Sequence, residues 1–187
     1  MRSFEFRSGA LFLDLVDTVA RRGFDQVDLI EEPDHIVRWA LLSKRLPFMA
    51  GVEIADSDLK RLRNLREALH EAACAAIEHR DVNPDHLVEI NEAASLRPPR
   101  VFLTAEGSNM KSDAPVDAML AMLATEAIAV LGSDLSQRLR KCHGCSMVFL
   151  DNSRPGKRIW CSSSAGCGNQ AKTRRHRKST QNREKHA

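Results

Sequence analysis

The sequence predicts a mainly α-helical protein of the α+β class. We expect a helical N-terminal domain with a small β-hairpin, followed by a cysteine-rich module that ends in a basic helix. Three observations lead to this expectation. Apolar residues recur at helical spacing through most of residues 33–131. The apolar content comes mainly from Ala, Leu, Val and Met, with no Tyr, which favours helices over a β-sandwich. Four of the five cysteines follow residue 137.

Two helices are expected in the first half of the chain. The first begins at Pro33 and Asp34, and its apolar face consists of Ile36, Val37, Ala40 and Leu41. The second keeps the 3.6-residue period for five turns, from Leu59 to Ile77. We expect Asp56 or Ser57 to cap it, because side-chain oxygens at the N-cap accept the free backbone N–H groups of the first turn.

Two further helices and a hairpin are expected before residue 133. Asn83 is the expected N-cap of the third helix and Pro84 its first residue, with a buried stripe of Leu87, Ile90 and Ala94. Residues 101–104 suit a strand, and the polar turn at residues 107–109 closes a hairpin. Pro115 opens the last long helix, and Gly132 suits its C-terminal end; its apolar positions are Met119, Met122, Leu123, Ile128, Val130 and Leu131.

The charge is divided unevenly along the chain. Residues 138–187 contain 13 basic and two acidic residues, a formal charge of +11, whereas the rest contains 15 basic and 23 acidic residues, a charge of −8. Two parts of opposite charge suggest two tasks. Charged residues interrupt the apolar N-terminus, and no apolar run approaches the roughly 20 residues that span a bilayer. We therefore expect no signal peptide, no membrane partner and a cytoplasmic location.

Four cysteines have the spacing of a metal site. Cys142 and Cys145 form a C-x2-C pair around Gly144, and 15 residues separate them from Cys161, which precedes Cys167 by a wider C-x5 spacing. Such pairs fit tetrahedral Zn²⁺, and four thiolates leave no open coordination position, so we expect one structural zinc ion. Two disulfides or a redox pair are the alternatives, and neither suits a cytosolic chain without a βαβ pattern.

The basic residues of the last fifty positions suggest a nucleic-acid interface. A loop before the second cysteine pair carries Arg154, Lys157 and Arg158. The expected final helix carries Lys172, Arg174, Arg175, Arg177 and Lys178, which point all round the helix axis. No apolar residue lies between Ala171 and Ala187, so this helix has no face to bury, and a positively charged rod suits a phosphate-lined groove. A solvated basic tail is the alternative.

The N-terminal part offers one candidate catalytic pattern. Asp14 and Asp17 are three residues apart in a helical pattern, so a paired-carboxylate acid/base site is conceivable. The alternative is a helix with two solvated or capping acids. Trp39 and Phe48 are expected in the core, Cys74 as a buried thiol, and His70 and His79 on the surface.

The cysteine-rich part resembles the CGNR zinc finger. Its hallmark Cys-Gly-Asn-Arg corresponds here to residues 167–170, CGNQ, and residues 149–154 and 158–162 also match its pattern. Residues 9–18, GALFLDLVDT, are similar to the opening of the ABATE domain, which usually precedes this finger. In two departures, Gln170 replaces the name-giving Arg, and Asp17 stands where the family usually has Asn.

The resemblance implies a bacterial stress-related transcription regulator whose N-terminal domain senses a ligand. We expect an ABATE-like domain at residues 1–133 and the zinc finger at 134–187. The candidate ligand-binding residues are Asp14, Asp17, Thr18 and Trp39. Duplex DNA is the expected partner, and symmetry favours binding as a homodimer. An RNA-binding or ribosome-associated module is a second hypothesis, and an enzyme using Asp14 and Asp17 is a third.

Overall fold

The computed structural model describes residues 3–162, 164 and 166–184, with side chains as far as residue 177. Its helices are α1 (Leu11–Val16), α2 (Pro33–Leu42), α3 (Asp56–Glu78), α4 (Pro84–Ser95), α5 (Pro115–Leu131) and α6 (Cys167–Glu184), with short 3-10 helices η1 (Pro47–Met49) and η2 (Asp134–Arg138). Its strands are β1 (Val19–Ala20), β2 (Val27–Asp28), β3 (Arg100–Thr104), β4 (Gly107–Lys111), β5 (Leu139–Lys141) and β6 (Val148–Leu150). The predicted mainly α-helical class, with a final basic helix, is confirmed.

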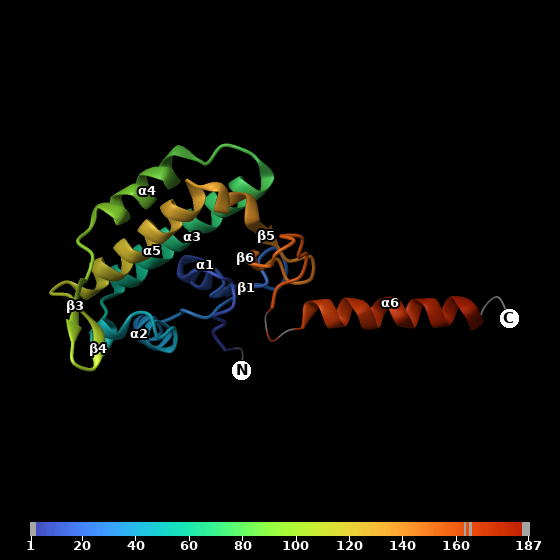
Figure 1. Ribbon diagram of the computed structural model, residues 1–187, viewed down its shortest axis with the longest axis horizontal. Coiled ribbons are helices and arrows are strands. Elements are labelled where there is room, and N and C mark those ends of the chain that lie inside the picture. Colours follow the sequence, from blue (N-terminus) through green and yellow to red (C-terminus); the bar gives the residue numbers. More distant parts are fainter. Residues whose placement is uncertain (1–2, 163, 165, 185–187) are drawn as a thin grey trace.

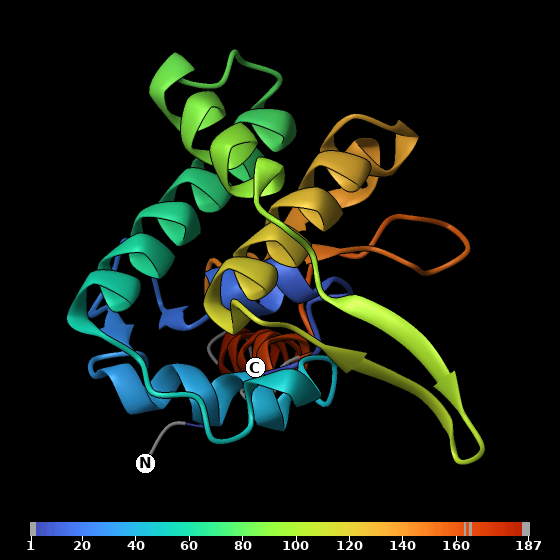
Figure 2. The ribbon, with the colours of Figure 1, turned by 90° about the vertical axis from the view of Figure 1, so that its left-hand side faces the viewer.

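Helices α1, α3, α4 and α5 pack together to form the body of the protein (Figures 1 and 2). Every residue of α1 is buried, because this short helix contacts α3, α5 and β6. Leu62, Leu65 and Leu69 of α3 are buried at the predicted helical spacing. Trp39 of α2 is fully buried, as expected, with its ring 6.3 Å from that of Phe6.

The ends of three helices test the predicted caps. Asn83 caps α4 as expected, and its Oδ1 accepts the N–H of Asp85 at 3.0 Å. The predicted cap of α3 is wrong: Ala55 is its N-cap, and the Asp58 carboxylate accepts the N–H of Ala55 at 3.3 Å. An acid at the third position can reach back to that N–H, so the cap position itself does not need a polar side chain. Helix α5 ends at Leu131, and Gly132 is its C-cap with φ of −84°, so the expected left-handed C′ glycine is not found at this position.

Some residues of the predicted apolar faces lie on the surface. Leu87 is 45% exposed, because α4 contacts α3 and α5 through Ile90 and Ala93 instead. Ile128 of α5 and Leu41 of α2 are also exposed. A helical repeat identifies a face only to within about one residue, and the neighbouring helices decide where its edge lies.

The described residues form three antiparallel strand pairs, whereas the sequence indicated one hairpin. The predicted hairpin is confirmed as β3–β4, with Val101 opposite Met110, and it projects from the body (Figure 2). The predicted position of its turn is wrong: the turn lies at residues 105–106, and residues 107–109 belong to β4. The pairs β1–β2 and β5–β6 have strands of two and three residues. Strands this short contain too few residues for the alternation of apolar and polar side chains that predicts longer ones.

A buried ion network fixes β2 and the end of α1 on α3. Arg66 of α3 has a side chain only 4% exposed, and its guanidinium donates to both carboxylate oxygens of Asp28, at 2.7 Å each. The same group donates to Thr18 Oγ1 at 3.1 Å and to Glu67 at 3.1 Å. Glu67 also accepts two hydrogen bonds from Arg22, at 2.6 and 2.9 Å.

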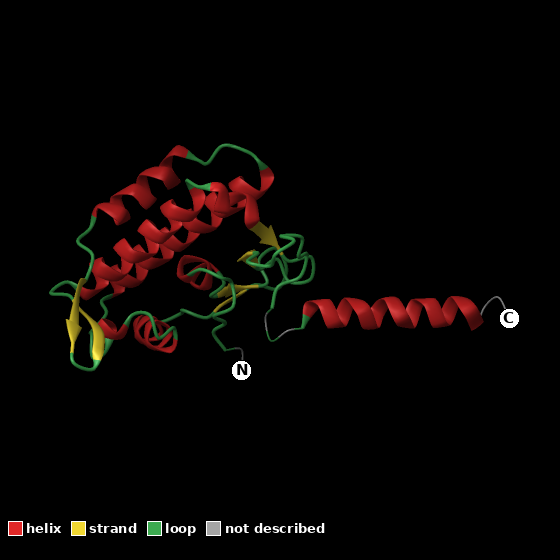
Figure 3. Ribbon diagram, viewed as in Figure 1, coloured by secondary structure: helices red, strands yellow, loops and turns green. Residues whose placement is uncertain are grey.

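The C-terminal part shares its second strand with the body. Val148 and Leu150 of β6 belong to the main core, whereas Phe149 between them belongs to a smaller cluster around the cysteines. The N–H of Leu150 donates to the carbonyl of Ser8 at 2.7 Å, which fastens the N-terminal segment along β6. Helix α6 extends away from the rest of the molecule (Figures 1 and 3). Among the described helices, none has the length and apolar content needed to cross a bilayer.

Candidate functional site

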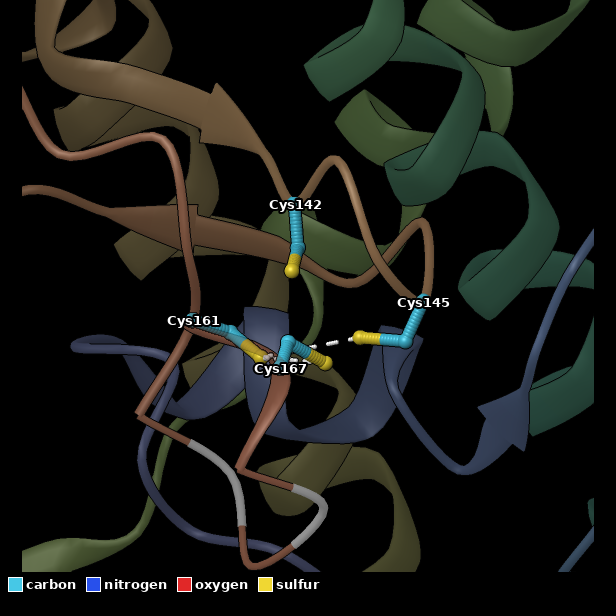
Figure 4. A group of neighbouring side chains, drawn as sticks. All are labelled: Cys142, Cys145, Cys161 and Cys167. Carbon is cyan, nitrogen blue, oxygen red and sulfur yellow. Dashed lines mark hydrogen bonds between the residues drawn. The ribbon is translucent and has the colours of Figure 1, made fainter. Parts of the chain in front are cut away.

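The four predicted cysteine ligands meet at one point (Figure 4). Their Sγ atoms all lie within 4.8 Å of one another, with 3.5 Å between Cys145 and Cys161 and 3.8 Å between Cys161 and Cys167. Zn–S bonds of about 2.3 Å in a tetrahedron place the sulfurs about 3.8 Å apart, so these positions fit one Zn²⁺ ion.

The first two ligands lie on a tight turn after β5. The N–H of Cys142 donates to the carbonyl of Met147 at 2.8 Å, and the N–H of Gly144 donates to Cys142 Sγ at 3.4 Å. A Cβ at Gly144 would lie 2.9 Å from the Cβ of Cys167 and 3.1 Å from its Sγ. The turn therefore needs glycine because of the close approach of Cys167, and the left-handed residue of the turn is Ser146, with φ of 61°.

The last two ligands are joined by a loop that is fastened to the N-terminal segment. Glu5 accepts hydrogen bonds from both the N–H, at 3.0 Å, and the hydroxyl of Ser164. Arg7 donates to the carbonyl of Ser162 at 3.1 Å. Gly166 has a left-handed φ of 61° just before Cys167 begins α6. The wide C-x5-C spacing is thus compatible with a compact site, because other parts of the chain hold the loop in place.

Two of the four thiol groups have raised pKa values. The hydrogen bond with Cys161, followed by burial, raises the pKa of Cys145, and burial raises the pKa of Cys167 to about 11. Without a metal these groups would stay protonated at neutral pH, so zinc binding must displace their protons. Four sulfurs complete the coordination shell, which makes the site structural.

A short loop after β6 is built around a buried carboxylate. Asp151 is fully buried and accepts the N–H groups of Ser153, at 3.0 Å, and Arg158, at 2.9 Å. These two N–H groups outweigh the effect of burial and lower the pKa of Asp151. Arg138 donates to the carbonyls of Asp151 and Ser153, at 3.0 and 3.1 Å, so it closes the loop from the other side.

The three basic residues predicted on this loop have different surroundings in the structure. The guanidinium of Arg158 lies 5.0 Å from the ring centre of Phe149 and donates to the carbonyl of Trp160 at 3.3 Å. Arg158 therefore helps to hold the module together. Arg154 and Lys157 are exposed.

The predicted cations of the final helix are displayed to solvent. The side chains of Lys172, Arg174, Arg175 and Arg177 are all exposed, because α6 carries no apolar face to pack on the body. The backbone of Lys178 lies within α6, and its side chain falls outside the described residues. Cys167 is the first residue of α6, so the metal site fixes one end of the helix.

The four candidate ligand-binding residues of the body have different surroundings. Asp14 is buried, and its Oδ1 accepts the hydroxyl of Ser8 at 2.6 Å and the N–H of Ser8 at 3.1 Å. Burial raises its pKa to about 6. Thr18 is buried and contacts Arg66, and Trp39 lies in the core.

Asp17 alone of these four lines a cleft between the body and the zinc module. Burial raises its pKa well above the ordinary value, and the nearby charges of Asp14 and Cys161 raise it further. The cleft has a volume of about 610 Å³. Asp14 is not among its lining residues, so the structure does not bring the two carboxylates into this cleft as the enzyme hypothesis requires.

Several residues of the site had no signature in the sequence. Arg22 and His70 line the cleft, although His70 was expected on the surface. Burial lowers the pKa of His70 to about 4, so it is neutral at physiological pH. Asp151 and Arg138 organise the loop after β6. Their roles depend on contacts between distant segments, which no local pattern shows.

Comparison with protein families gives two matches that together cover most of the chain. The ABATE family, described as "Putative stress-induced transcription regulator", matches residues 9–134. The CGNR zinc finger matches residues 138–179, which contain all four clustered cysteines. A search of curated proteins found no match to the chain. The second match and the geometry agree that the four cysteines bind one structural zinc ion.

Proposed function

Because the chain belongs to the ABATE family and carries a CGNR zinc finger, we propose that it is a DNA-binding transcription regulator. In this proposal the zinc module presents α6 to duplex DNA, and the N-terminal domain responds to a small molecule. The observation that supports it best is the set of exposed cations on a helix whose first residue is a zinc ligand.

The charge of the module suits a polyanion. A zinc ion with four thiolates carries a net charge of −2, so a module with a formal charge of +11 keeps about +9. Neutralising phosphates releases condensed counterions, and this release drives binding at physiological salt. Arginine predominates among the described cations of α6, and its planar fork suits both phosphates and guanine edges.

The shape of α6 suits a groove. The helix contains 18 residues, which at about 1.5 Å per residue gives a rod of about 27 Å. The major groove of B-DNA admits an α-helix, and cations on all sides can contact both phosphate backbones. Exposed Arg154 and Lys157 give the module two further candidate phosphate contacts outside α6.

The test measures binding to duplex DNA as a function of salt concentration. In the test variant, Lys172, Arg174, Arg175 and Arg177 are changed to Ala; in the control, four exposed cations of the body, Arg38, Lys44, Lys60 and Arg97, are changed to Ala. We expect the test variant to bind at least 100-fold more weakly, on the order of a factor of ten for each pair of lost phosphate contacts, with a shallower salt dependence. Equal affinities of the two variants would contradict the proposal.

Structured RNA is the competing partner. The described side chains of α6 include no Phe, Tyr or Trp, whose stacking on bases supports most single-strand recognition. We therefore expect duplex DNA to compete at least as well as structured RNA at the same salt concentration. Preferential binding of the RNA would replace the DNA proposal by the RNA-binding one.

A further inference from the structure

The cleft between the body and the zinc module is lined by both parts of the chain. From the body come residues of α1, the β1–β2 connection and α3, including Asp17, Arg22 and His70. From the module come the turn at Gly144 and Cys145 and the first two turns of α6, including Arg174. Its volume of about 610 Å³ lies within the usual range for small-molecule sites.

The cleft contains polar groups whose bonding capacity is not used. Oδ2 of Asp17 and Nε of Arg22 are buried, and neither has a hydrogen-bond partner among the described residues. Buried polar atoms without partners are uncommon in folded proteins, because each costs about 1–3 kcal/mol. Oδ2 of Asp17 is a hydrogen-bond acceptor on a residue that lines the cleft, so it points to a bound molecule that carries a hydrogen-bond donor.

The charge balance of the cleft is acidic. Arg22 is already paired with Glu67, at 2.6 Å, and Arg21 is paired with Asp25. Two of the zinc ligands, Cys145 and Cys167, line the cleft, and the complete zinc–thiolate site carries a charge of −2. Asp17 forms no salt bridge within 4.0 Å of a described residue, and the charge of Arg22, which acts on it from farther away, is shared with Glu67. Arg174 of α6 also lines the cleft and offsets one of these negative charges. A cation would compensate the remaining excess, whereas an anion would add to it.

The rest of the lining provides an apolar surface. Phe24 of the β1–β2 connection is 66% exposed, although it is a large aromatic residue. Val19, Leu29 and Met147 also line the cleft. An apolar ligand group placed against Phe24 would remove part of this surface from water, at about 25 cal/mol per Å².

We propose that this cleft binds a small organic amine, with its ammonium group on the Asp17 carboxylate and its apolar group against Phe24. The inference rests on the proposed function, because it assigns a place and a chemical class to the small molecule sensed by the regulator. The amine lies against both α3 and α6, so it stabilises one placement of α6 relative to the body. Ligand binding and nucleic-acid binding are thereby coupled, and each changes the affinity of the other by the same factor.

The experiment uses three probes of similar size on the zinc-loaded full chain. 2-Phenylethylamine carries the ammonium group, 2-phenylethanol is its neutral counterpart, and phenylacetate is the anionic one. Amide shifts in NMR titrations up to about 10 mM give both affinity and location, a range suited to so small a ligand. We expect the amine to bind at least 10-fold more tightly than the other two, and to shift the amides of Asp17, Gly144 and Gln170.

Two variants and a control identify the groups responsible. Asp17→Asn keeps the shape of the side chain and is expected to weaken amine binding about 10-fold, because it removes a charge-assisted hydrogen bond. Phe24→Ala changes an exposed residue and is expected to weaken binding of the amine without affecting the fold. Asp113→Asn removes an exposed carboxylate outside the cleft and should leave the affinity unchanged.

The outcomes separate this inference from the proposed function. No shift with the amine, equal affinity of the three probes, tighter binding of phenylacetate, or shifts outside the cleft would each overturn the amine site. Affinity for duplex DNA, measured on the same samples without any probe, tests the proposed function independently. A chain that binds DNA and ignores the amine therefore refutes only the inference.

Discussion

At the residue scale, the geometry of the metal site depends on a position without a side chain. Gly144 lies against Cys167, and the space that any Cβ would take is already filled by that ligand. The neighbouring Ser146 has the left-handed φ that a glycine would more commonly provide. Hence the glycine of the C-x2-C turn is required for packing around the metal, and a larger residue would displace a zinc ligand.

Gly144→Ala should weaken zinc binding. The new Cβ would lie 2.9 Å from the Cβ of Cys167, so either the turn or the start of α6 must move. We expect at least a 10-fold loss of zinc affinity, measured by competition with a chromogenic chelator. Gly51→Ala controls for general destabilisation by a glycine substitution, since a Cβ there meets no atom within 4 Å but its φ of 74° makes alanine strained, and Gly51 lies far from the cysteines in sequence. Wild-type zinc affinity in Gly144→Ala would contradict the packing argument.

Asp14 should make the stability of the body depend on pH. Its folded-state pKa of about 6 exceeds the ordinary 3.8, because burial disfavours the charged form. The folded state therefore holds the Asp14 proton more tightly than the unfolded state does. The resulting contribution to the free energy of unfolding is complete below about pH 4 and is lost as the pH rises through 6. The difference amounts to about 3 kcal/mol.

Asp14→Asn removes this titration while keeping an oxygen that can accept from Ser8. We expect the free energy of unfolding of the variant relative to wild type to rise by about 2–3 kcal/mol between pH 4 and pH 7. Denaturant unfolding of both proteins across this range provides the measurement, and loss of zinc at low pH affects both proteins alike. A difference in the free energy of unfolding that stays constant from pH 4 to pH 7 would show that Asp14 ionises normally.

At the element scale, ion pairs and backbone hydrogen bonds hold elements that are too short to be stable alone. Strands β1 and β2 have two residues each, and Asp28 of β2 is held by Arg66 of α3. Arg66 opposes the effect of burial and lowers the pKa of Asp28. The loop after β6 is organised in the same way by Asp151 and Arg138.

Arg66→Met should destabilise the body strongly. The substitution leaves the half-buried Asp28 without its bidentate partner, which typically costs about 3 kcal/mol or more. Arg100→Met is the matched control, since the Arg100–Asp113 pair is largely exposed and such pairs contribute about 0–1 kcal/mol. Denaturant unfolding monitored by far-UV circular dichroism compares the two variants, and similar losses in both would refute the special role of Arg66.

At the scale of the whole molecule, the two parts are joined by a shared strand and by the N-terminal segment. In β6, Val148 and Leu150 belong to the body core and Phe149 to the zinc cluster. Glu5 and Arg7 reach the loop between Cys161 and Cys167. A change in the zinc module can therefore affect the body, and the cleft between them lies where such a change would be transmitted.

Removal of zinc should unfold the module and leave most of the body folded. The cluster around the cysteines contains few apolar residues, so the metal supplies much of its folding free energy, on the order of 10 kcal/mol. The core of α1, α3, α4 and α5 contains none of the four metal ligands. After chelation we expect protease cleavage beyond residue 141, loss of DNA binding and retention of most helical circular dichroism. Complete unfolding would show instead that the two parts fold as one unit.

The sequence by itself determined the features that depend on local spacing. Helical periodicity predicted α3 and α5, Asn83 and Pro84 marked the start of α4, and the cysteine spacing identified the zinc ligands. The absence of apolar residues between Ala171 and Ala187 predicted that α6 would not pack against the body. Each of these follows from neighbours within a few turns, or from the fixed chemistry of thiolates and a metal ion.

Only the tertiary structure decided which residues meet across long separations. The guanidinium of Arg158 lies over the ring of Phe149, while Arg154 and Lys157 on the same loop are exposed. The tertiary structure enclosed Asp14 with Ser8 and placed Asp17 in the wall of a cleft with His70 and Arg174. Burial and the charges of distant partners set the environment of each of these groups, and both arise only when the whole chain has packed.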